Sequence, residues 1–341
     1  MALVLNEEQL MLKDAAAGFL AEKATLADLR RLRDERGEDG FDRGIWQEMA
    51  EMGWAGIAIP EAFGGLDYGY TGLGIVLEQM GRNLSVSPLQ SSVLVAGTAV
   101  AQAGSDAQKE ALLPAIASGE LLVTLALQEG ALHNPEQTAL QARPEGDGHV
   151  LSGEKVLVLD AHVADKFIVV ARTSGDPGDS DGLSLFLVDS DAQGVSVERV
   201  VMVDSRNAGK LQLDNVLVGA DARLGELDAG GALLQRILDI ANIGLSAELL
   251  GLSLEAFERT MEYLKERKQF GELIGSFQSL QHRSAELFAE LELAKSVVLK
   301  ALQAIDENDE DLSRLASACK AKLCQVAKRA TNETIQMHGG I

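Results

Sequence analysis

The sequence predicts an α+β fold in which a helical segment, a strand-rich segment and a second helical segment follow one another along 341 residues. The hydrophobic spacing indicates this order, because intervals of three and four give way to short β-branched runs near residue 121 and return near residue 229. The chain has 46% hydrophobic residues and is longer than chains that usually fold around a single hydrophobic core. We therefore expect an N-terminal all-α domain over 1–120, a middle β-domain over 121–228 and a C-terminal helical bundle over 229–341. This segregated order disfavours the alternating βαβ pattern of a doubly wound sheet.

The first segment predicts several helices separated by turn-forming residues. Asn6 can cap the first helix, because Gln9 stands three positions later, as in a capping box. The hydrophobic residues that follow recur on one helical face and are Leu12, Ala16, Phe19 and Leu20. Further helical runs are expected over about 43–53, 72–83 and 106–118, with breaks at GIAIPEAFGG and NLSVSPL.

Short runs rich in β-branched residues mark the strands of the middle segment. They cover Leu122–Leu127, His149–Leu151, Lys155–Leu159, Phe167–Ala171, Leu183–Val188, Val195–Val201 and Leu211–Leu217. Turns such as EGDG and SGDPGDSDG separate these runs. The segment is therefore expected to form a compact antiparallel β-barrel or sandwich.

The last segment predicts long helices of a bundle. In one of them the apolar positions recur mostly at intervals of three and four, at Leu280, Leu287, Leu291, Ala294, Val298, Ala301 and Ile305.

The formal net charge of −22 disfavours nucleic acid and anionic membrane surfaces as partners, because both attract clustered Lys and Arg. No membrane span is expected, since no stretch reaches about 18 apolar residues. The N-terminus MALVLNEEQLMLKD also lacks the regions of a signal peptide. Cys319 and Cys324 lie five apart on a predicted helix and face different ways, which predicts reduced thiols and a cytoplasmic setting.

The motifs of several common enzyme classes are missing. The sequence contains no GxGxxG after a strand, no P-loop, no GxSxG and no HExxH. The five histidines show no ligand spacing, so no metal site is expected.

Several segments, taken in order, resemble the acyl-CoA dehydrogenases. They are LNEEQLMLKDAAAGFL, GWAGIAIPEAFGGLDYGY, GSDAQKEALLPAIASGEL, LSGEKVLVLDAHVADKFIVVAR and LKERKQFGELIGSFQSLQHRSAEL, followed by IQMHGG. The resemblance runs over the whole chain and implies a helical domain, a middle β-domain and a four-helix bundle, with FAD held between them and across a subunit interface. The segments VLSGEKVLVLDAHVADK and RKQFGELIGSFQSLQHR look most similar to the smaller subunits of two-gene dehydrogenases, of the pimeloyl-CoA dehydrogenase type.

The resemblance implies cofactor-binding residues in the last segment. Arg267 in ERKQFG matches the family arginine that reaches the FAD pyrophosphate of the neighbouring subunit, where its fixed fork of donors suits two phosphate oxygens. Other residues fall where the family packs against FAD or bonds it, or where the missing Cβ lets the backbone come close to the dinucleotide. These are Phe270, Phe277, Gln278, Gln336, Gly339 and Gly340.

The middle segment departs from the family pattern. Where many relatives show TEPGAGSD beside the flavin, residues 128–135 read QEGALHNP, and where they show WIT, residues 157–159 read LVL. Gln128 and Leu159 thus stand at cofactor positions without the hydroxyls of the family. Backbone N–H groups can still bond the flavin ring, because every non-proline residue keeps its donor.

The catalytic residues are unknown from the sequence. The family takes a proton from the carbon beside the thioester carbonyl with a carboxylate. The usual base position is expected beyond Ile341, so the bundle is expected to be incomplete in this sequence or shortened in a natural subunit. Relatives that place the base on the first bundle helix have it where this chain has Ala241, followed by Asn242 in place of a substrate-side arginine. Asp239 and Glu248 lie nearby and are interpreted as surface or interface carboxylates.

Three hypotheses follow from the resemblance. The first is an FAD-dependent acyl-CoA dehydrogenase that forms a 2-enoyl-CoA and passes electrons to an electron-transfer flavoprotein, as part of a homo- or hetero-tetramer. The second is a non-catalytic subunit that helps to form an FAD site while a dehydrogenase-like partner supplies the base. The third is a helical interaction protein that has lost flavin. The acyl group is open and includes fatty acid, steroid side-chain and dicarboxylic substrates.

Overall fold

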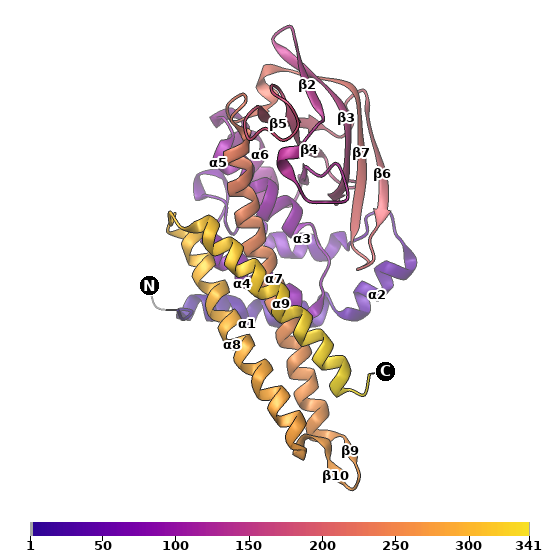
Figure 1. Cartoon of the computed structure of the whole chain (residues 1–341). Helices are drawn as coiled ribbons and strands as arrows, with labels where there is room; N and C mark the ends of the chain where they lie inside the picture. Colours follow the sequence, from indigo (N-terminus) through magenta and orange to yellow (C-terminus); the bar gives the residue numbers. More distant parts are fainter. Residues whose placement is uncertain (1–2, 341) are drawn as a thin grey trace. The chain divides into compact units, whose positions relative to one another are not determined.

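The computed structural model describes residues 3–340, which form two compact units (Figure 1). The helical unit contains the described residues up to Leu29, Gly69–Ser85 and the residues from Asp239 onward. The sheet unit contains Arg30–Tyr68 and Val86–Leu238. Each unit combines segments that lie far apart in the sequence. The expected domain boundaries near residues 120 and 228 therefore do not coincide with the boundaries of the units, and the three-domain division stays a prediction.

Long helices build the helical unit. Its elements are α1 (Glu7–Lys23), α4 (Gly69–Asn83), most of α7 (Gly230–Glu266), α8 (Gln278–Asp306), α9 (Leu312–Met337), the strands β9 (Lys268–Gln269) and β10 (Glu272–Leu273), and the 3₁₀ turn η5 (Ile274–Ser276). The predicted capping box at the start of α1 is confirmed, because Asn6 and Gln9 each accept a backbone N–H of the other, at 2.8 and 3.0 Å. The short helix α2 (Leu26–Glu35) begins in this unit and ends in the sheet unit.

Glycines let α4 and α7 approach each other closely. A Cβ on Gly81 would lie 2.0 Å from the carbonyl oxygen of Glu248, and one on Gly251 would lie 1.8 Å from that of Glu78. The backbones therefore touch where these helices cross. On α8 the predicted core face is confirmed at Leu287, Leu291, Ala294, Val298, Ala301 and Ile305, all of which are buried. Leu280, the first residue of the predicted face, is half-buried.

The helical elements of the sheet unit are α3 (Arg43–Glu51), η1 (Glu61–Phe63), the π-helix η2 (Leu89–Gly97), α5 (Thr98–Ala103), α6 (Asp106–Ala117), η3 (Pro135–Gln137) and η4 (Ala220–Ala222). Two of them, α3 and α6, coincide with predicted runs, and the predicted run at 72–83 is α4 of the helical unit. The remaining helical elements of the sheet unit were not predicted. Asp42 caps α3 by accepting the N–H groups of Gly44 and Ile45.

Eight strands form one sheet in the order β6-β7-β3-β2-β4-β5-β8, and β1 pairs with β4. Their bounds are β1 (Val123–Ala126), β2 (Gln141–Glu145), β3 (Gly148–Leu159), β4 (Lys166–Arg172), β5 (Leu183–Asp189), β6 (Val195–Val201), β7 (Asn207–Val218) and β8 (Arg223–Leu224). The expected antiparallel pairing holds for most neighbours. The pairs that β4 makes with β1 and with β2 are parallel, so the sheet is mixed.

The sequence prediction differs from the sheet at β2, β3 and the short strand β8, which was not predicted. The runs at 149–151 and 155–159 belong to one strand, β3, whose register shifts twice opposite β7. Strand β2 was not predicted, because its sequence QARPE is polar and holds Pro144, which lacks an N–H for the ladder. It pairs with β3 all the same.

One described helix, α7, is long and apolar enough to span a bilayer by length and composition. In its most apolar window 67% of the residues are buried inside the fold, which also fits a core helix. The expectation that no segment is sufficiently apolar therefore does not hold for α7. Cys319 is buried and Cys324 exposed, and both are free thiols as predicted.

Candidate functional site

The predicted cofactor residues of the last segment lie at one end of the helical unit. Strands β9 and β10 form a hairpin there, between α7 and α8 (Figure 1). Its two-residue turn is Phe270-Gly271, with φ of 56° and 83°. Positive φ at both turn residues is what a tight hairpin requires, and a phenylalanine rarely adopts it. The turn thus holds Phe270 in a strained conformation.

Arg267 and two aromatic rings surround this hairpin. The Arg267 carbonyl accepts the N–H of Ile274 at 2.9 Å, which fixes the backbone at the base of the hairpin. Its exposed guanidinium pairs with no carboxylate among residues 3–340. Phe270 is 92% exposed, and its ring meets that of Phe277 edge-on with centroids 6.3 Å apart. Gln278 opens α8 immediately afterwards and is exposed. The unpaired Arg267 guanidinium and the exposed rings of Phe270 and Phe277 therefore lie at the same hairpin.

The end of α9 packs against the helices that adjoin the hairpin. His338 stacks on Tyr263 of α7 with centroids 4.3 Å apart, and Glu333 pairs with Arg283 of α8 at 2.6 Å. These contacts bring the exposed Gln336 and the two terminal glycines to the same end of the unit.

The glycines at the end of α9 leave open space around the backbone. Gly339 and Gly340 have φ of 103° and 72°, and no atom lies within 4 Å of a Cβ built on either. Steric crowding within the chain therefore does not explain why glycine occupies these two positions, whereas their positive φ does. The backbone remains accessible to a ligand.

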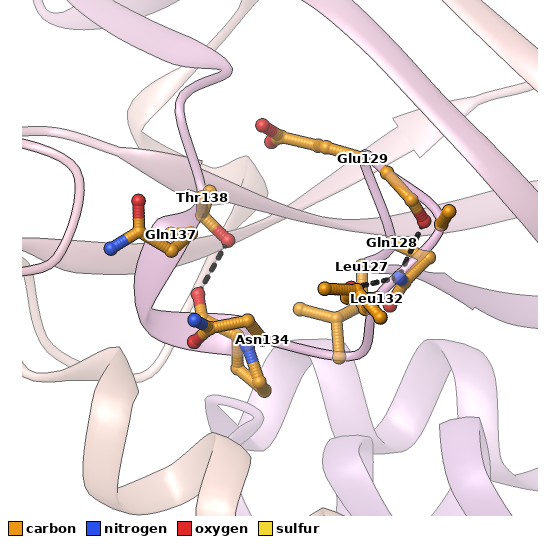
Figure 2. Close-up of a pocket in the computed structure, with 10 residues that line it drawn as sticks. Leu127, Gln128, Glu129, Leu132, Asn134, Gln137 and Thr138 are labelled. Carbon is orange, nitrogen blue, oxygen red and sulfur yellow. Dashed lines mark hydrogen bonds between the residues drawn. The ribbon is translucent and has the colours of Figure 1, made fainter.

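The sheet unit carries the second group of predicted residues. The loop from Leu127 to Thr138 curls around a pocket of about 510 Å³ (Figure 2). The Gln128 amide donates to the carbonyls of Gly130 and Leu132, at 2.7 and 2.5 Å. Within the part of the chain that the structure describes, the N–H groups of Gly130, Ala131 and Leu132 bond no other residue. The pocket loop thus offers successive free donors.

A strained corner ends β3 next to this loop. Leu157 and Asp160 have φ of 52°, and Leu157 is 49% exposed. The backbone of Leu159 is held by the buried hydroxyl of Thr124, which donates to its carbonyl at 2.8 Å. Ser91 donates to the Asp160 carboxylate at 2.6 Å. A leucine in this conformation is costly and persists only where its surroundings impose it.

Burial governs the ionisation of the carboxyl at this corner. It raises the pKa of Asp160 from 3.8 to about 6, while the Ser91 hydroxyl and the charge of Arg206 act in the opposite direction. Neither this carboxyl nor the Thr124 hydroxyl could be predicted from sequence spacing, because their hydrogen-bond partners lie tens of residues away.

Two further residues, one in the pocket loop and one on β3, were not predicted to have a role at this site. Lys155 on β3 is fully buried and donates to the Glu129 carboxylate at 2.5 Å. The family pattern TEPGAGSD could have indicated Glu129, because its second residue is a glutamate that this chain retains.

The alternative base position on α7 offers no acid. Ala241 and Asn242 are half-buried, and neither side chain can abstract a proton. Asp239 and Glu248 were interpreted as surface or interface carboxylates, and the surface alternative is wrong, because they are 5% and 8% exposed. The interface alternative stays a prediction. Glu248 lies where α7 crosses α4, with Gly81 against its backbone.

Comparison with known proteins identifies the family. Models of the acyl-CoA dehydrogenase N-terminal, middle and C-terminal domains match residues 6–120, 129–216 and 228–341. A 3-(aryl)acrylate reductase of Clostridium sporogenes is 32% identical over 88% of this chain and 81% of its own length. The chain belongs to the acyl-CoA dehydrogenase family. The family assignment and the predicted fold class are thereby confirmed.

Two other similar proteins bear on function. Subunit CarC of a caffeyl-CoA reductase–Etf complex from Acetobacterium woodii is 29% identical over 98% of this chain and 89% of its own length. The solved steroid ACAD Tcur3481-Tcur3483 is 33% identical with a TM-score of 0.87, over 98% of this chain and 87% of that one.

Members of this family are FAD-dependent flavoproteins, and the described residues fit this cofactor. The unpaired Arg267 guanidinium suits a pyrophosphate, and the open backbone at Gly339 and Gly340 admits close approach. The pocket loop supplies free N–H donors for a ring with acceptor atoms. No group of acidic, histidine or cysteine side chains suited to a metal ion occurs among residues 3–340.

Proposed function

We propose that this chain is the FAD-binding subunit of an acyl-CoA dehydrogenase that converts an acyl-CoA thioester into a 2-enoyl-CoA. Electrons leave to an electron-transfer flavoprotein, and the assembly is a homo- or hetero-tetramer. The unpaired, exposed Arg267 beside the strained Phe270 turn carries this proposal. If Arg267 were buried or paired with a carboxylate, the proposed FAD-binding role would lose its main support.

Each group of residues has a role in the proposal. Arg267 pairs with the pyrophosphate of a neighbouring subunit's FAD, because two parallel N–H donors match two phosphate oxygens. The Phe270 and Phe277 rings cover the dinucleotide beside it. Bound FAD supplies a two-electron acceptor for hydride from the β-carbon. The N–H donors of the pocket loop orient the ring of the subunit's own FAD.

The reaction also needs a carboxylate that accepts the α-proton. We assign this base to none of the residues 3–340, because α7 presents Ala241 and Asn242 at the helix position that some relatives use. In this proposal the base comes from another position in the assembly.

The non-catalytic subunit is the second candidate function, and the same Ala241 and Asn242 favour it. In this case the chain completes an FAD site and a dehydrogenase-like partner carries the base. The relation to subunit CarC supports an assembly with an electron-transfer flavoprotein in either case.

Flavin content and bleaching test the proposal and separate the two candidates. The full chain is purified alone and with candidate dehydrogenase subunits, and its bound flavin is measured. Anaerobic mixing with fatty, steroid side-chain and dicarboxylic acyl-CoAs should bleach the flavin. Bleaching by the chain alone contradicts the non-catalytic role, whereas bleaching only by the pair contradicts a self-sufficient enzyme. A chain without flavin in every combination sinks both candidates.

A pair of variants tests the arginine itself. Arg267→Met should raise the dissociation constant for FAD about tenfold or more, because a charge-assisted bidentate pair is lost. Lys268→Met is the matched control, since it removes the adjacent exposed cation of the same hairpin and should change the constant less than twofold. Equal losses in both variants would indicate general electrostatic attraction rather than a pyrophosphate site.

The direction of the reaction needs its own measurement, since two relatives carry reductase names. Reduced enzyme mixed with 2-enoyl-CoA should be reoxidised if the chain also serves the reverse reaction.

A further inference from the structure

The pocket loop is closed on itself by one carboxylate and one buried ammonium. The ammonium group of Lys155 donates to the Leu127 carbonyl at 3.1 Å and to Glu129 at 2.5 Å. The Glu129 carboxylate also accepts the N–H groups of Ala139 and Leu140, at 2.7 and 3.0 Å. This side chain therefore joins the beginning of the loop to its end.

A second buried cation holds the far side of the loop. Arg172 on β4 is 3% exposed and donates to the carbonyls of Glu136 and Thr138, at 2.7 and 3.1 Å. It also donates to the Asp181 carbonyl at 2.7 Å, so it ties the pocket wall to the next loop. Both ends of the pocket loop are thus fixed to strands of the sheet.

The middle of the loop has no such anchor. Between Gly130 and Asn134 its side-chain support is the Gln128 amide, and Leu132 is 84% exposed. The free N–H donors lie in this stretch, so their position depends on the anchors at both ends.

Stability alone does not account for the buried ammonium. Lys155 has no exposed surface, and taking an ammonium out of water costs enough that an apolar residue of similar size often serves stability equally well. A charged pair has one property that an apolar contact lacks, which is that it fixes a specific geometry through directed bonds.

We propose that Lys155 and Glu129 are positioning residues for the flavin ring. They hold the pocket loop so that the N–H groups of Gly130, Ala131 and Leu132 stand ready as donors at the pocket. The proposal rests on the proposed function, because it takes the ligand of this pocket to be the flavin end of FAD.

The test compares full-length variants in FAD binding and in the apo protein. Lys155→Met should raise the dissociation constant for FAD at least about tenfold and alter the visible circular dichroism of the bound flavin. In the apo protein, amide exchange in residues 127–140 should quicken about tenfold. The unfolding midpoint of the sheet unit should change little or rise. Lys155→Arg keeps the charge and should restore most of the affinity.

Two further variants keep the test interpretable. Arg199→Met is the matched control, because Arg199 on β6 also ties a loop through the carbonyls of Gly37 and Glu38 and bonds no pocket residue. It should leave FAD affinity and flavin spectrum unchanged. Glu129→Gln replaces Lys155→Met if that variant does not fold, and it should give the same losses.

The outcomes separate this inference from the proposed function. Unchanged affinity, spectrum and amide exchange in Lys155→Met overturn the positioning role while FAD binding stands. Equal losses in Arg199→Met also overturn it, since the effect would then be general. If the wild-type chain binds no FAD, the proposed function fails and this role fails with it. Faster exchange in 127–140 with intact FAD binding shows that the pair orders the loop but positions no flavin.

Discussion

Replacing Asp160 by asparagine should stabilise the sheet unit at neutral pH. Burial raises the pKa of this carboxyl from 3.8 to about 6, so its ionised form is disfavoured in the folded chain. Asparagine removes the charge, can accept the same hydrogen bond from Ser91, and tolerates the φ of 52°. The displaced pKa corresponds to up to about 3 kcal/mol. Contact of the partly exposed carboxyl with water reduces this to about 1–2 kcal/mol.

The direction of the pH dependence follows from the state, folded or unfolded, that holds the proton of Asp160 more tightly. Between about pH 4 and 6 the folded chain keeps a proton on Asp160 that the unfolded chain has lost. The contribution of this group is therefore most favourable below pH 4 and is lost as the pH rises through 6. The advantage of Asp160→Asn should be full at pH 7.5 and shrink to about a third at pH 4.5.

Tryptophan fluorescence during urea unfolding provides the assay. The two tryptophans of the chain, Trp46 and Trp54, both lie in the sheet unit, so they report the unit that holds Asp160. Asp228→Asn is a control of opposite sign, because hydrogen bonds from Thr173 and Ser174 lower the pKa of Asp228. It should lose stability at pH 7.5, and the loss should fade in acid below pH 4. A less stable Asp160→Asn at pH 7.5, or an advantage at pH 4.5 as large as that at pH 7.5, refutes the reasoning.

Two further predictions concern the helical unit and are measured by far-ultraviolet circular dichroism during unfolding. Gly251→Ala should destabilise it by about 1–3 kcal/mol, because the new Cβ meets the Glu78 backbone at the helix crossing. Gly18→Ala on α1 has open space and should stabilise by up to about 1 kcal/mol, so equal effects would contradict the crossing argument. Asp306→Ala should cost about 1 kcal/mol, because its carboxylate accepts the N–H groups of Tyr70 and Thr71 and so caps α4. An unchanged midpoint would show that water replaces this cap.

Local signals in the sequence predicted several of the helices but missed α2, η2 and α5. The Asn6 capping box and the buried face of α8 depend on residues three or four positions apart, which is the range that periodicity reports. Strand β2 escaped because its partners decide its structure, and QARPE has little strand preference of its own. The bend that joins 149–151 to 155–159 in β3 likewise depends on its register opposite β7.

In the candidate site, too, residues marked by a local motif were predicted, whereas residues joined by long-range contacts were not. Arg267, Phe270 and the terminal glycines were predicted from motifs, and the hairpin and the end of α9 bring them to one end of the helical unit. Their roles toward FAD stay predictions. The bond between Lys155 and Glu129 joins residues 26 positions apart, and no periodicity connects them. The surface interpretation failed for Glu248 because spacing along one helix does not show how closely a neighbouring helix, here α4, approaches it.

The buried anchors give a physical reason why the pocket loop can differ from its relatives and keep its conformation. In QEGALHNP the glutamate is the letter retained from TEPGAGSD at its position, and it is the residue that closes the loop through Lys155, Ala139 and Leu140. The donors offered at the pocket are backbone groups, which every non-proline residue supplies. Loss of the flanking hydroxyls therefore removes side-chain bonds to a flavin without moving the backbone that would bind it. It follows that restoring a hydroxyl at Gln128 should affect flavin binding less than removing the charge at Lys155.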